Sequence, residues 1–564
     1  MILVQSYFFS SKTASFSKKI QFSTLYTFQK NKNRNFALKI KNMLLTIISL
    51  VFFCVYVAFK AKREVHIMQQ NSYFISRYWD WWKKNTKLAF APAEVSAVAL
   101  GITTLPFLLG ESPFSNVLFM AIFAIATYRF YKDKPKKALV ITPRVKRLFV
   151  VIAVLFVLAI ALLWYFNVNL LLALPLLAIG SFVFLILASL ILQPIENSIN
   201  QGFIDDAKKR LRSMPNLKVI GITGSYGKTS VKHFLARILS EKYNVLHTPG
   251  SVNTTLGVVR IIREQLKPTH EVFIAEMGAK KMGDVAEICD LVQPTIAILT
   301  AIGPEHLETF GDMKNVQQGN FELPKSIKAD GLNILNADYE LVREYPDNNG
   351  KKIFYGIENL DADFRGDNIQ YTATGMTFDL YKKGEKIQTL ETKLLGAHNV
   401  SNIVSACAVA YELEVPPAKI AYAVRNLAAV QHRLEIKRNP GGITIIDDAF
   451  NSNPTGARMA VEVLGKVQGN KKIIVTPGMI ELADEEYAYN KEFGKQIAAV
   501  CDYVVLVGPK QTIPIQDGLK EVAYPDAKTY IAKNLTDAIN HLKGITQAGD
   551  VVLYENDLPD TYNE

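Results

Sequence analysis

A glycine-rich turn at residues 224–230 carries the residue types that bind phosphate. It follows a β-branched run at 218–223 and reads Gly224-Ser225-Tyr226-Gly227-Lys228-Thr229-Ser230. Beyond it, apolar side chains recur at helical spacing at Val231, Phe234, Leu235, Ile238 and Leu239. Glycines let backbone N–H groups close around phosphate oxygens, and the N-terminal end of a helix favours an anion. The order of strand, turn and helix therefore predicts a phosphate-binding loop.

Two side chains of this loop have the chemistry to act on a nucleotide. Lys228 can reach the β- and γ-phosphates, and the Thr229 hydroxyl can ligate Mg²⁺. The longest form of the motif has glycine where this chain has Ile222, whereas the shorter Gly-x-x-Gly-Lys-Thr form is intact. The alternative is a chance glycine turn at the start of a helix. Because Lys-Thr stands directly at that start, after a strand, we favour the binding loop.

Glu276 and His306 each stand near the end of an apolar run. Glu276 closes the run 272–276, and His306 follows the run 295–300 by a few residues. A carboxylate at the end of a buried strand has little reason to be there unless it binds something. The structural alternatives are a helix-capping carboxylate and an ordinary surface imidazole. Clustered hard ligands near phosphates are what a Mg²⁺ site needs, so the upstream loop favours the binding interpretation.

These side chains can meet only if parallel strands end at a common edge. Short β-branched runs alternate with helical stretches from residue 217 onward. The runs are 218–223, 272–276, 295–300, 443–446, 473–475, 503–507 and 551–554. This alternation predicts an α/β fold of parallel sheets with crossover helices.

The first 200 residues have a different composition. Their apolar runs are 43–59, 95–109, 114–128, 148–166 and 170–192. The last two are long enough to span a bilayer, and no charged residue occurs from 148 to 192. The segment 129–147 carries eight Lys or Arg residues, which places it on the cytoplasmic side. We therefore predict an α-helical transmembrane region, with the chain in the cytoplasm from about residue 200.

Charge and cysteine content argue against several classes of protein. The net charge of +12 is concentrated beside the apolar segments, so we expect a membrane partner and no nucleic acid. The four cysteines have no CxxC spacing, which argues against a disulfide scaffold and a zinc site. The apolar runs contain no cluster of ionisable residues, so a transport role has no support. Residues 1–63 lack Asp and Glu, as in a transit peptide or an over-extended gene start, with Met43 and Met68 as other starts.

The soluble motifs resemble those of the Mur ligases, most of all the type that adds D-alanyl-D-alanine (the MurF type). The resemblance starts at the phosphate loop and covers about residues 205–510 in the family's order. The further motifs are Asn253-Thr254-Thr255-x-Gly257, Glu276-Met277-Gly278-Ala279, His306-Leu307-Glu308-x-Phe310-Gly311, Asn336-Ala337-Asp338, Gly396-Ala397-His398-Asn399-Val400-x-Asn402, Asp447-Asp448-Ala449-Phe450-Asn451-Ser452-Asn453-Pro454 and Pro477-Gly478-Met479-x-Glu481-Leu482. Any one of these motifs alone is weak evidence for the family, whereas the full set in the family's order is specific for it.

The resemblance implies ATP and Mg²⁺ as cofactors and a role for each matching residue. The nucleotide phosphates are expected at Gly224, Ser225, Gly227, Lys228, Thr229 and Ser230. The matching Glu276, with Thr229, would hold Mg²⁺, and His306 would serve a second metal ion. Lys228, Glu276, His306 and Arg433 are the implied catalytic residues.

Four further residues are implied to contact the nucleotide. Asn402 and His398 come from the start of an apolar helix, whereas Asp448 and Asn451 follow the strand at 443–446. The matching Asp approaches the ribose, and the matching Arg433 approaches the phosphates. The simpler alternatives are helix capping by Asn, turn residues and a solvated loop charge.

Three departures from the family pattern bear on the substrate. Asn320 stands where the family has a carbamylated lysine that bridges metal ions. Apolar helices occupy the place of the soluble domain that grips the UDP-sugar. Near the end, Tyr554-Glu555-Asn556-Asp557 replaces a Lys-Gly-Ser-Arg stretch, and acidic residues in place of basic ones change which charged substrate is tolerated.

We expect four segments: a basic segment with one apolar helix at 1–92, transmembrane helices at 93–200, a P-loop central ATP-binding domain with a mostly parallel sheet at 201–430 and a Rossmann-like C-terminal α/β domain at 431–564. The implied activity is a membrane-anchored ATP-dependent amide ligase that works through an acyl phosphate. Its partners would be a small-molecule or lipid-linked carboxylate acceptor and an amino-acid or dipeptide donor such as D-Ala-D-Ala. The alternatives are a relative acting on a polyglutamate-type chain or a lipid-linked glycan, and a catalytically degenerate ATP-binding scaffold. The oligomeric state stays open.

Overall fold

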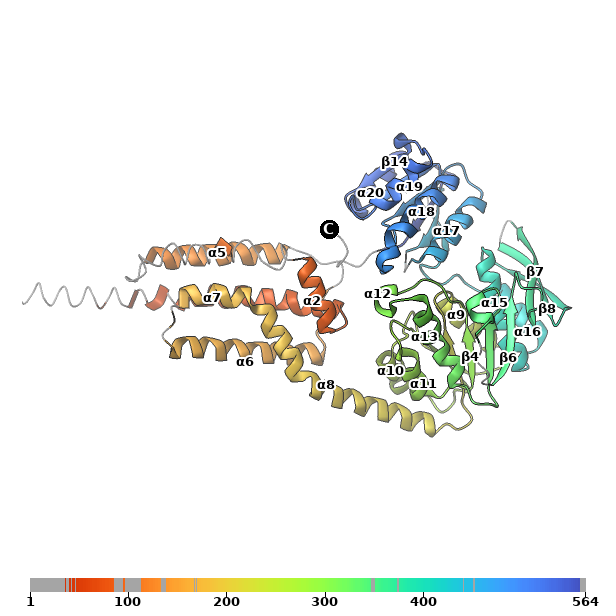
Figure 1. Ribbon diagram of the computed structural model, residues 1–564, viewed down its shortest axis with the longest axis horizontal. Coiled ribbons are helices and arrows are strands. Elements are labelled where there is room, and N and C mark those ends of the chain that lie inside the picture. The colour runs from red at the N-terminus through yellow and green to blue at the C-terminus, as the bar shows by residue number, and fades with distance from the viewer. Residues whose placement is uncertain are drawn as a thin grey trace, which may run out of the picture. The chain divides into compact units, whose positions relative to one another are not determined.

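A computed structural model describes residues 36, 40–41, 43–45, 47–85, 95–96, 113–132, 138–166, 168, 170–345, 350–372, 375–439, 441–449 and 452–557. Its internal contacts divide the chain into two units, Met1–Ser198 and Ile199–Glu564 (Figure 1). Unit 1 has an apolar core of its own, and unit 2 contains two sheets with separate cores.

Unit 1 is built from helices. Among the described residues, three helices are long and apolar enough to cross a membrane: Met43–Gln70, α6 (Pro143–Tyr165) and α8 (Ser181–Arg212). The other described helices are α2 (Ile75–Lys84), α5 (Pro113–Lys132) and α7 (Leu170–Ile179). The predicted runs 43–59, 114–128 and 148–166 thus fall on helices. The predicted run 95–109 lies outside the described residues except for its first two.

The predicted apolar run 170–192 does not form one span. It is interrupted at Gly180, which lies between α7 and α8. Lys60 donates a hydrogen bond of 2.8 Å from its Nζ to the backbone oxygen of Ala178, near the end of α7. A cation is favourable at a helix C-terminus, and Ser181 at the start of α8 donates to the Glu64 carboxylate at 2.6 Å. Hydropathy alone could not show this break, because Lys60 and Glu64, which form hydrogen bonds to the residues beside it, lie more than 100 residues earlier in the sequence.

A nine-stranded sheet forms the first part of unit 2, in the order β2-β3-β1-β4-β5-β6-β7-β8-β9. Neighbouring strands from β2 to β7 are parallel, and β8 and β9 are antiparallel to their neighbours. The strands are β1 (Lys218–Thr223), β2 (Val245–His247), β3 (Val272–Glu276), β4 (Ile296–Leu299), β5 (Leu332–Asn336), β6 (Lys351–Gly356), β7 (Phe364–Thr372), β8 (Gly375–Lys382) and β9 (Glu385–Thr392). The helices are α9 (Lys228–Leu239), α10 (Thr255–Gln265), α11 (Asp284–Val292), α12 (Leu307–Phe310), α13 (Met313–Ser326), α14 (Glu340–Arg343), α15 (Ala397–Glu412) and α16 (Pro417–Arg425).

The β7–β9 meander was not predicted, and it makes the central sheet mixed, with parallel strands from β2 to β7 and antiparallel pairing beyond. Its β8–β9 turn consists of Lys383 and Gly384, both with positive φ, at 49° and 82°. Such a turn matches the twist of a two-stranded hairpin. A Lys at its first position is a weaker sequence signal than the usual Asn or Asp, which explains why the hairpin was missed.

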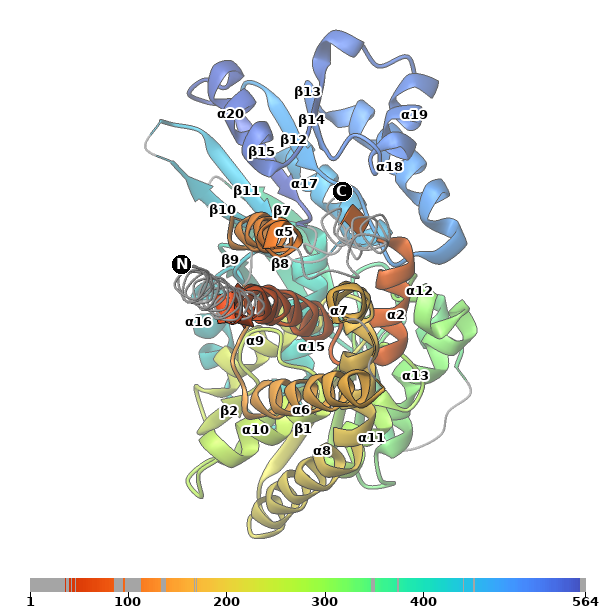
Figure 2. The same ribbon diagram turned by 90° about the vertical axis from the view of Figure 1, so that its left-hand side faces the viewer.

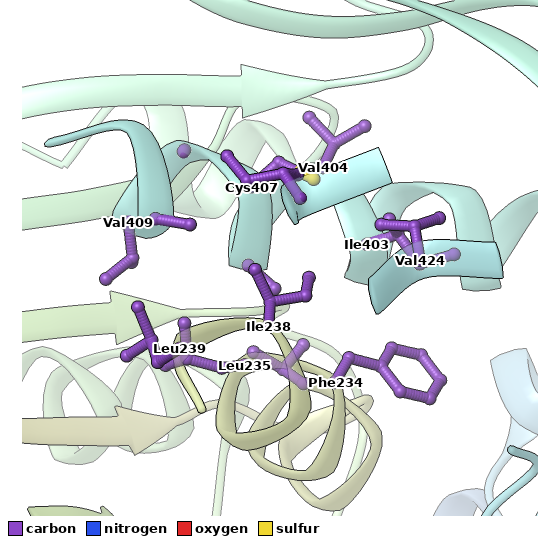
Figure 3. Close-up of a cluster of buried hydrophobic side chains, with 14 of the residues drawn as sticks. Phe234, Leu235, Ile238, Leu239, Ile403, Val404, Cys407, Val409 and Val424 are labelled. Carbon is purple, nitrogen blue, oxygen red and sulfur yellow. The ribbon is translucent and has the colours of Figure 1, made fainter. Parts of the chain in front are cut away.

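Helices α9 and α15 pack against each other and fix the direction of the phosphate loop. Leu235 and Ile238 of α9 lie opposite Ile403 and Cys407 of α15, and all four side chains are fully buried (Figure 3). The predicted apolar face of α9 is therefore its core face. Because α9 begins at Lys228, this packing holds the loop residues at the carboxyl end of β1.

The C-terminal part of unit 2 has a six-stranded sheet in the order β10-β11-β15-β12-β13-β14. Only β10 is antiparallel to its neighbour. The strands are β10 (Glu435–Arg438), β11 (Thr444–Asp448), β12 (Lys472–Thr476), β13 (Tyr503–Val507), β14 (Thr529–Ala532) and β15 (Val551–Glu555). Helices α17 (Pro454–Lys466), α18 (Glu486–Val500) and α19 (Ile513–Glu521) cover one face, and α20 (Leu535–Ile545) covers the other (Figure 2). The predicted strands at 443–446, 473–475, 503–507 and 551–554 are confirmed.

Candidate active site

The phosphate loop has the backbone that its glycines predict. Gly224 and Gly227 have φ of 135° and 80°, and Gly227 caps the start of α9. A Cβ atom at Gly227 would lie 2.7 Å from the Asn402 Oδ1, and one at Gly224 would lie 2.9 Å from the Ala301 backbone. Only glycine fits at either position, because both the conformation and the space exclude a side chain.

Lys228 lies folded over the loop that precedes it. Its Nζ donates to the backbone oxygens of Gly224 and of Ser225, the latter at 3.1 Å, and lies 3.5 Å from the Glu305 carboxylate. Ser225 is tied to the backbone of Gly303 by bonds of 3.0 and 3.1 Å. The lysine charge is therefore concentrated at the loop, beside the helix N-terminus, where an anion is favoured.

Glu276 is the centre of a buried polar cluster at the end of β3. Its Oε2 forms an ion pair of 2.8 Å with the Lys232 Nζ, and both side chains are almost fully buried. Its Oε1 accepts hydrogen bonds from the Thr229 hydroxyl and the Asn253 amide, each at 3.2 Å. Burial lowers the pKa of Lys232, and the adjacent Glu276 carboxylate opposes that shift.

Thr229 and Glu276 fit a Mg²⁺ ion. A hydroxyl oxygen and a carboxylate oxygen lie 3.2 Å apart at the phosphate loop, and oxygen ligands beside phosphates are what Mg²⁺ prefers. The ion pair with Lys232 occupies the other carboxylate oxygen, so Oε1 is the oxygen on the side of Thr229. Across the described part of the chain, no group of three or more His, Cys, Asp or Glu side chains stands ready for a metal ion. The ion would therefore draw its remaining ligands from phosphate and water.

His306 is held by acidic partners. It has φ of 52°, and its Nδ1 lies 2.6 Å from the Glu481 carboxylate in the C-terminal domain. Its Nε2 lies 3.6 Å from the Glu305 carboxylate, which also faces Lys228. The structure thus connects His306 to the phosphate loop through Glu305, and it does not bring His306 into a ligand cluster with Glu276.

Asn402 and His398 occupy the start of α15. The Asn402 side chain lies directly against Gly227 of the phosphate loop. The His398 ring lies against Gly396, which also faces Val463 of α17, and burial lowers the pKa of His398 to about 4. A neutral ring at physiological pH suits contact with an uncharged base rather than with phosphate.

Asp448 and Arg433 come together in the C-terminal domain. Burial raises the pKa of Asp448 to about 6, and the positive charge of Arg433 opposes this shift. The Asp448 Oδ1 accepts a hydrogen bond of 3.1 Å from the Leu434 backbone. The predicted nucleotide contact Asn451 lies outside the described residues, and Ser230 lies in the first turn of α9.

The side chain of Asn320 forms hydrogen bonds within the fold. It is 3% exposed, its amide nitrogen donates to the Val316 backbone at 2.9 Å, and its Oδ1 accepts from the Thr223 hydroxyl at 3.0 Å. It therefore ties α13 to the end of β1. A neutral amide of this length cannot supply the carboxylate that a carbamylated lysine would present.

Sequence reasoning assigned no role to three charged residues of this site: Lys232, Glu305 and Glu481. Lys232 follows Lys228 at one turn of helix, and that spacing could have shown that it faces the same strand ends. Glu305 precedes the recognised His306, and Glu481 lies inside a recognised motif. No periodic signal connects Glu481 to His306, because the contact joins segments 175 residues apart.

The comparisons with known proteins agree with this geometry. Residues 222–410 match the Mur ligase middle domain, and residues 432–554 match the Mur ligase glutamate ligase domain. The chain is 28% identical over 340 residues to UDP-N-acetylmuramoyl-tripeptide–D-alanyl-D-alanine ligase of Bacillus subtilis, covering 60% of this chain and 72% of that protein. It is 29% identical over 331 residues to the same enzyme of Escherichia coli, covering 57% and 73%.

Solved structures show the same architecture. MurF of Acinetobacter baumannii superposes with a TM-score of 0.58 at 25% identity, covering 64% of this chain and 78% of that one. MurF of Thermotoga maritima in complex with ADP has a TM-score of 0.57 at 24% identity, covering 64% and 80%, and supports the fold.

The fold and the phosphate site together define a Mur ligase, and this chain belongs to the Mur ligase family. Within the family its relatives are of the MurF type. It is an ATP-dependent, ADP-forming ligase that uses Mg²⁺.

Proposed function

We propose that this protein is a membrane-anchored ligase that joins a D-Ala-D-Ala-type dipeptide to a peptidoglycan precursor through an acyl phosphate. The observation that carries the proposal is the phosphate loop, with Lys228 folded over it and Thr229 beside the Glu276 carboxylate. The curated relatives, whose names state this reaction, support the choice of substrates.

Amide formation from a carboxylate requires a better leaving group than oxide. An acceptor carboxylate oxygen would attack the γ-phosphorus of ATP, and the bond to the ADP oxygen would break. The amine nitrogen of the donor would then attack the acyl carbon, phosphate would leave, and the surplus proton would pass to solvent. Lys228 is placed to neutralise charge on the transferring group. Mg²⁺, held by Thr229 and Glu276, would supply further neutralisation.

The C-terminal domain would complete the site. Arg433 would approach the phosphates, while Asp448 would approach the ribose, where His398 and Asn402 would line the nucleotide from the middle domain. The hydrogen bond between His306 and Glu481 supports such an approach, since it joins the two family domains. Excluding water at this point protects an acyl phosphate from hydrolysis.

We further propose that unit 1 anchors the enzyme in the bacterial inner membrane, with segment boundaries at residues 92, 200 and 430 and the ligase domains in the cytoplasm. Its three apolar helices support this, and α6 leaves Val150, Val154 and Leu158 exposed. An apolar surface of this kind marks contact with lipid. The same helices favour a second candidate acceptor, a lipid-linked precursor, over a soluble UDP-sugar.

The proposal is tested with the full chain purified in detergent. ATP, Mg²⁺, D-Ala-D-Ala and UDP-N-acetylmuramoyl-tripeptide or its lipid-linked form are supplied, and ADP release and the amide product are measured. ADP release is expected to require both acceptor and amine, and mass spectrometry should show loss of one water from their sum. ADP release without an amide from any acceptor and amine in the panel would contradict it. Turnover with the lipid-linked form alone would select the second acceptor.

A further inference from the structure

A buried carboxylate occupies the middle of the carboxyl edge of the C-terminal sheet. Glu555 is the last residue of β15 and is 1% exposed. Strand β15 lies between β11 and β12, and Asp448 is the register partner of Glu555 on β11. An acidic side chain at this depth requires partners, because an unpaired buried charge is costly.

Two hydroxyls from different loops bind the two oxygens of Glu555. Ser452 donates to Oε1, and Thr476 donates to Oε2 at 2.5 Å. Ser452 lies in the chain segment 449–453, between β11 and α17. The Thr476 hydroxyl accepts a hydrogen bond of 3.0 Å from the Gly478 backbone, so it also orients the loop 477–482. One carboxylate therefore holds Ser452, which follows β11, and Thr476 at the end of β12, and these two strands lie on either side of β15.

The next residue, Asn556, connects the same segments. Its backbone N–H donates to the Asp448 carbonyl oxygen at 3.2 Å, and its side-chain amide donates to the Gly478 carbonyl oxygen at 2.6 Å. It is 9% exposed and has φ of 63°. Glu555 and Asn556 thus form one connection between the ends of β11, β15 and β12.

Both segments adjoin contacts between the C-terminal domain and the middle domain. Loop 477–482 contains Glu481, which binds His306 at 2.6 Å. Ser452 lies three residues before Thr455, which belongs to the first turn of α17 and hydrogen-bonds to Tyr226 of the phosphate loop. The position of both contacts depends on how firmly the loops are held.

We propose that Glu555 is a positioning residue, which through Ser452 and Thr476 fixes the two loops that dock the C-terminal domain on the nucleotide site. It sets the rate of ligation without touching a substrate. The proposal rests on the ligase function proposed above. It concerns Glu555, which belongs to the stretch that stands in place of the family's Lys-Gly-Ser-Arg residues.

The charges around Glu555 make this role dependent on pH. Burial raises the pKa of Glu555 to about 7, the hydrogen bonds from Ser452 and Thr476 oppose the shift, and Asp448 adds to it. The other charged groups acting on the Asp448–Glu555 pair are Asp447 and Arg433. An ionised carboxylate accepts both hydroxyl hydrogens, whereas a protonated one must donate at one oxygen. We therefore expect both loops to be held best above about pH 7.

The test compares the full chain with Glu555→Gln and with a matched control, Glu492→Gln. Glu492 carries the same charge in the same domain and is exposed on α18. Hydrogen exchange of the backbone amides in 449–453 and 477–482 is measured, together with kcat for ligation between pH 6 and 9. Glu555→Gln should speed exchange in both loops about fivefold, as expected for the loss of a hydrogen bond. It should also abolish the rise of kcat through about pH 7, with KM for ATP unchanged.

The two measurements separate this inference from the proposed function. Parent-like exchange in both loops of Glu555→Gln would overturn the positioning role, whatever the activity. Loosened loops in a chain whose parent forms no amide would overturn the proposed function and leave the positioning role standing. If Glu555→Gln does not fold, Ser452→Ala removes one hydroxyl and should loosen 449–453 alone. Unchanged exchange there would overturn the inference as well.

Discussion

Lys228 and Lys232 lie one helical turn apart on α9 and have different surroundings. The Lys228 side chain is 13% exposed and contacts backbone oxygens and Glu305, so it stands where a ligand can reach it. The Lys232 side chain is 0% exposed and is paired with Glu276, whose side chain is 1% exposed. Removing one partner of a buried pair leaves the other charge without compensation. The first lysine is therefore available for binding, and the second is required for the fold of the site.

Substituting each lysine by alanine should separate these roles. Lys228→Ala is expected to raise the Kd for ADP about 10- to 100-fold, the loss of a charge-assisted hydrogen bond, with the urea midpoint unchanged. Lys232→Ala is expected to lower the free energy of unfolding by about 3–5 kcal/mol. Calorimetric titration with ADP and urea unfolding measure the two effects.

Lys328→Ala is the control, because Lys328 is exposed in the same domain. It should change neither quantity. A Lys228→Ala protein that binds and hydrolyses nucleotide as the parent does would remove the basis for the phosphate loop as the site of ATP.

The helices and strands show which parts of the fold can be predicted from sequence patterns and which cannot. The strand β1 and the apolar face of α9 were predicted because each is a short, regular run beside a glycine turn. The strands β7–β9 were missed because a Lys-Gly turn is a weak signal. The break at Gly180 was missed because its hydrogen-bond partners, Lys60 and Glu64, belong to a helix more than 100 residues earlier in the sequence.

Within the site, residues of contiguous motifs could be predicted from the sequence. Thr229 and Glu276 meet at 3.2 Å, as parallel strands ending at one edge require. Glu481 and Glu555 could not be assigned, because their contacts depend on how loops from separate strands are placed. For Asn320, alignment with the family motif identified the position, but its hydrogen bonds to Thr223 and Val316 could be found only in the structure.

The packing of α9 on α15 should be the main source of stability for the phosphate loop. Ile238→Ala would leave a cavity between the helices and is expected to lower the free energy of unfolding by about 2–5 kcal/mol. Urea unfolding measures it. Leu256→Ala on α10 is the matched control, because Leu256 is 43% exposed and its truncation should cost little. Equal losses for the two variants would show that this interface does not support the domain.

At the scale of the whole molecule, one chain combines apolar helices with a ligase. Unit 1 exposes apolar side chains along α6 and α8, whereas unit 2 has buried apolar cores on its two sheets. The central domain and C-terminal domain match the family, and the matched region begins at residue 222. The family's chemistry is thus carried by a chain whose first part has the composition of membrane helices.

Fractionation tests the anchor. The full chain is expected to pellet with membranes, to resist extraction by high salt and alkaline carbonate, and to dissolve in detergent, since buried apolar area rather than charge would hold it. Immunoblotting of the fractions measures the distribution. A fragment of residues 199–564 serves as the control and should stay in the supernatant. Release of the full chain by salt alone would show a peripheral protein.

The contact between His306 and Glu481 also decides the chemical form of the imidazole. A carboxylate can only accept a hydrogen bond when it is ionised, so at 2.6 Å the hydrogen must sit on Nδ1. In the neutral ring the lone pair then belongs to Nε2, the nitrogen on the side of Glu305. A loop of one domain thereby selects the tautomer of a side chain in the other, and with it the single atom of His306 that could coordinate a metal ion.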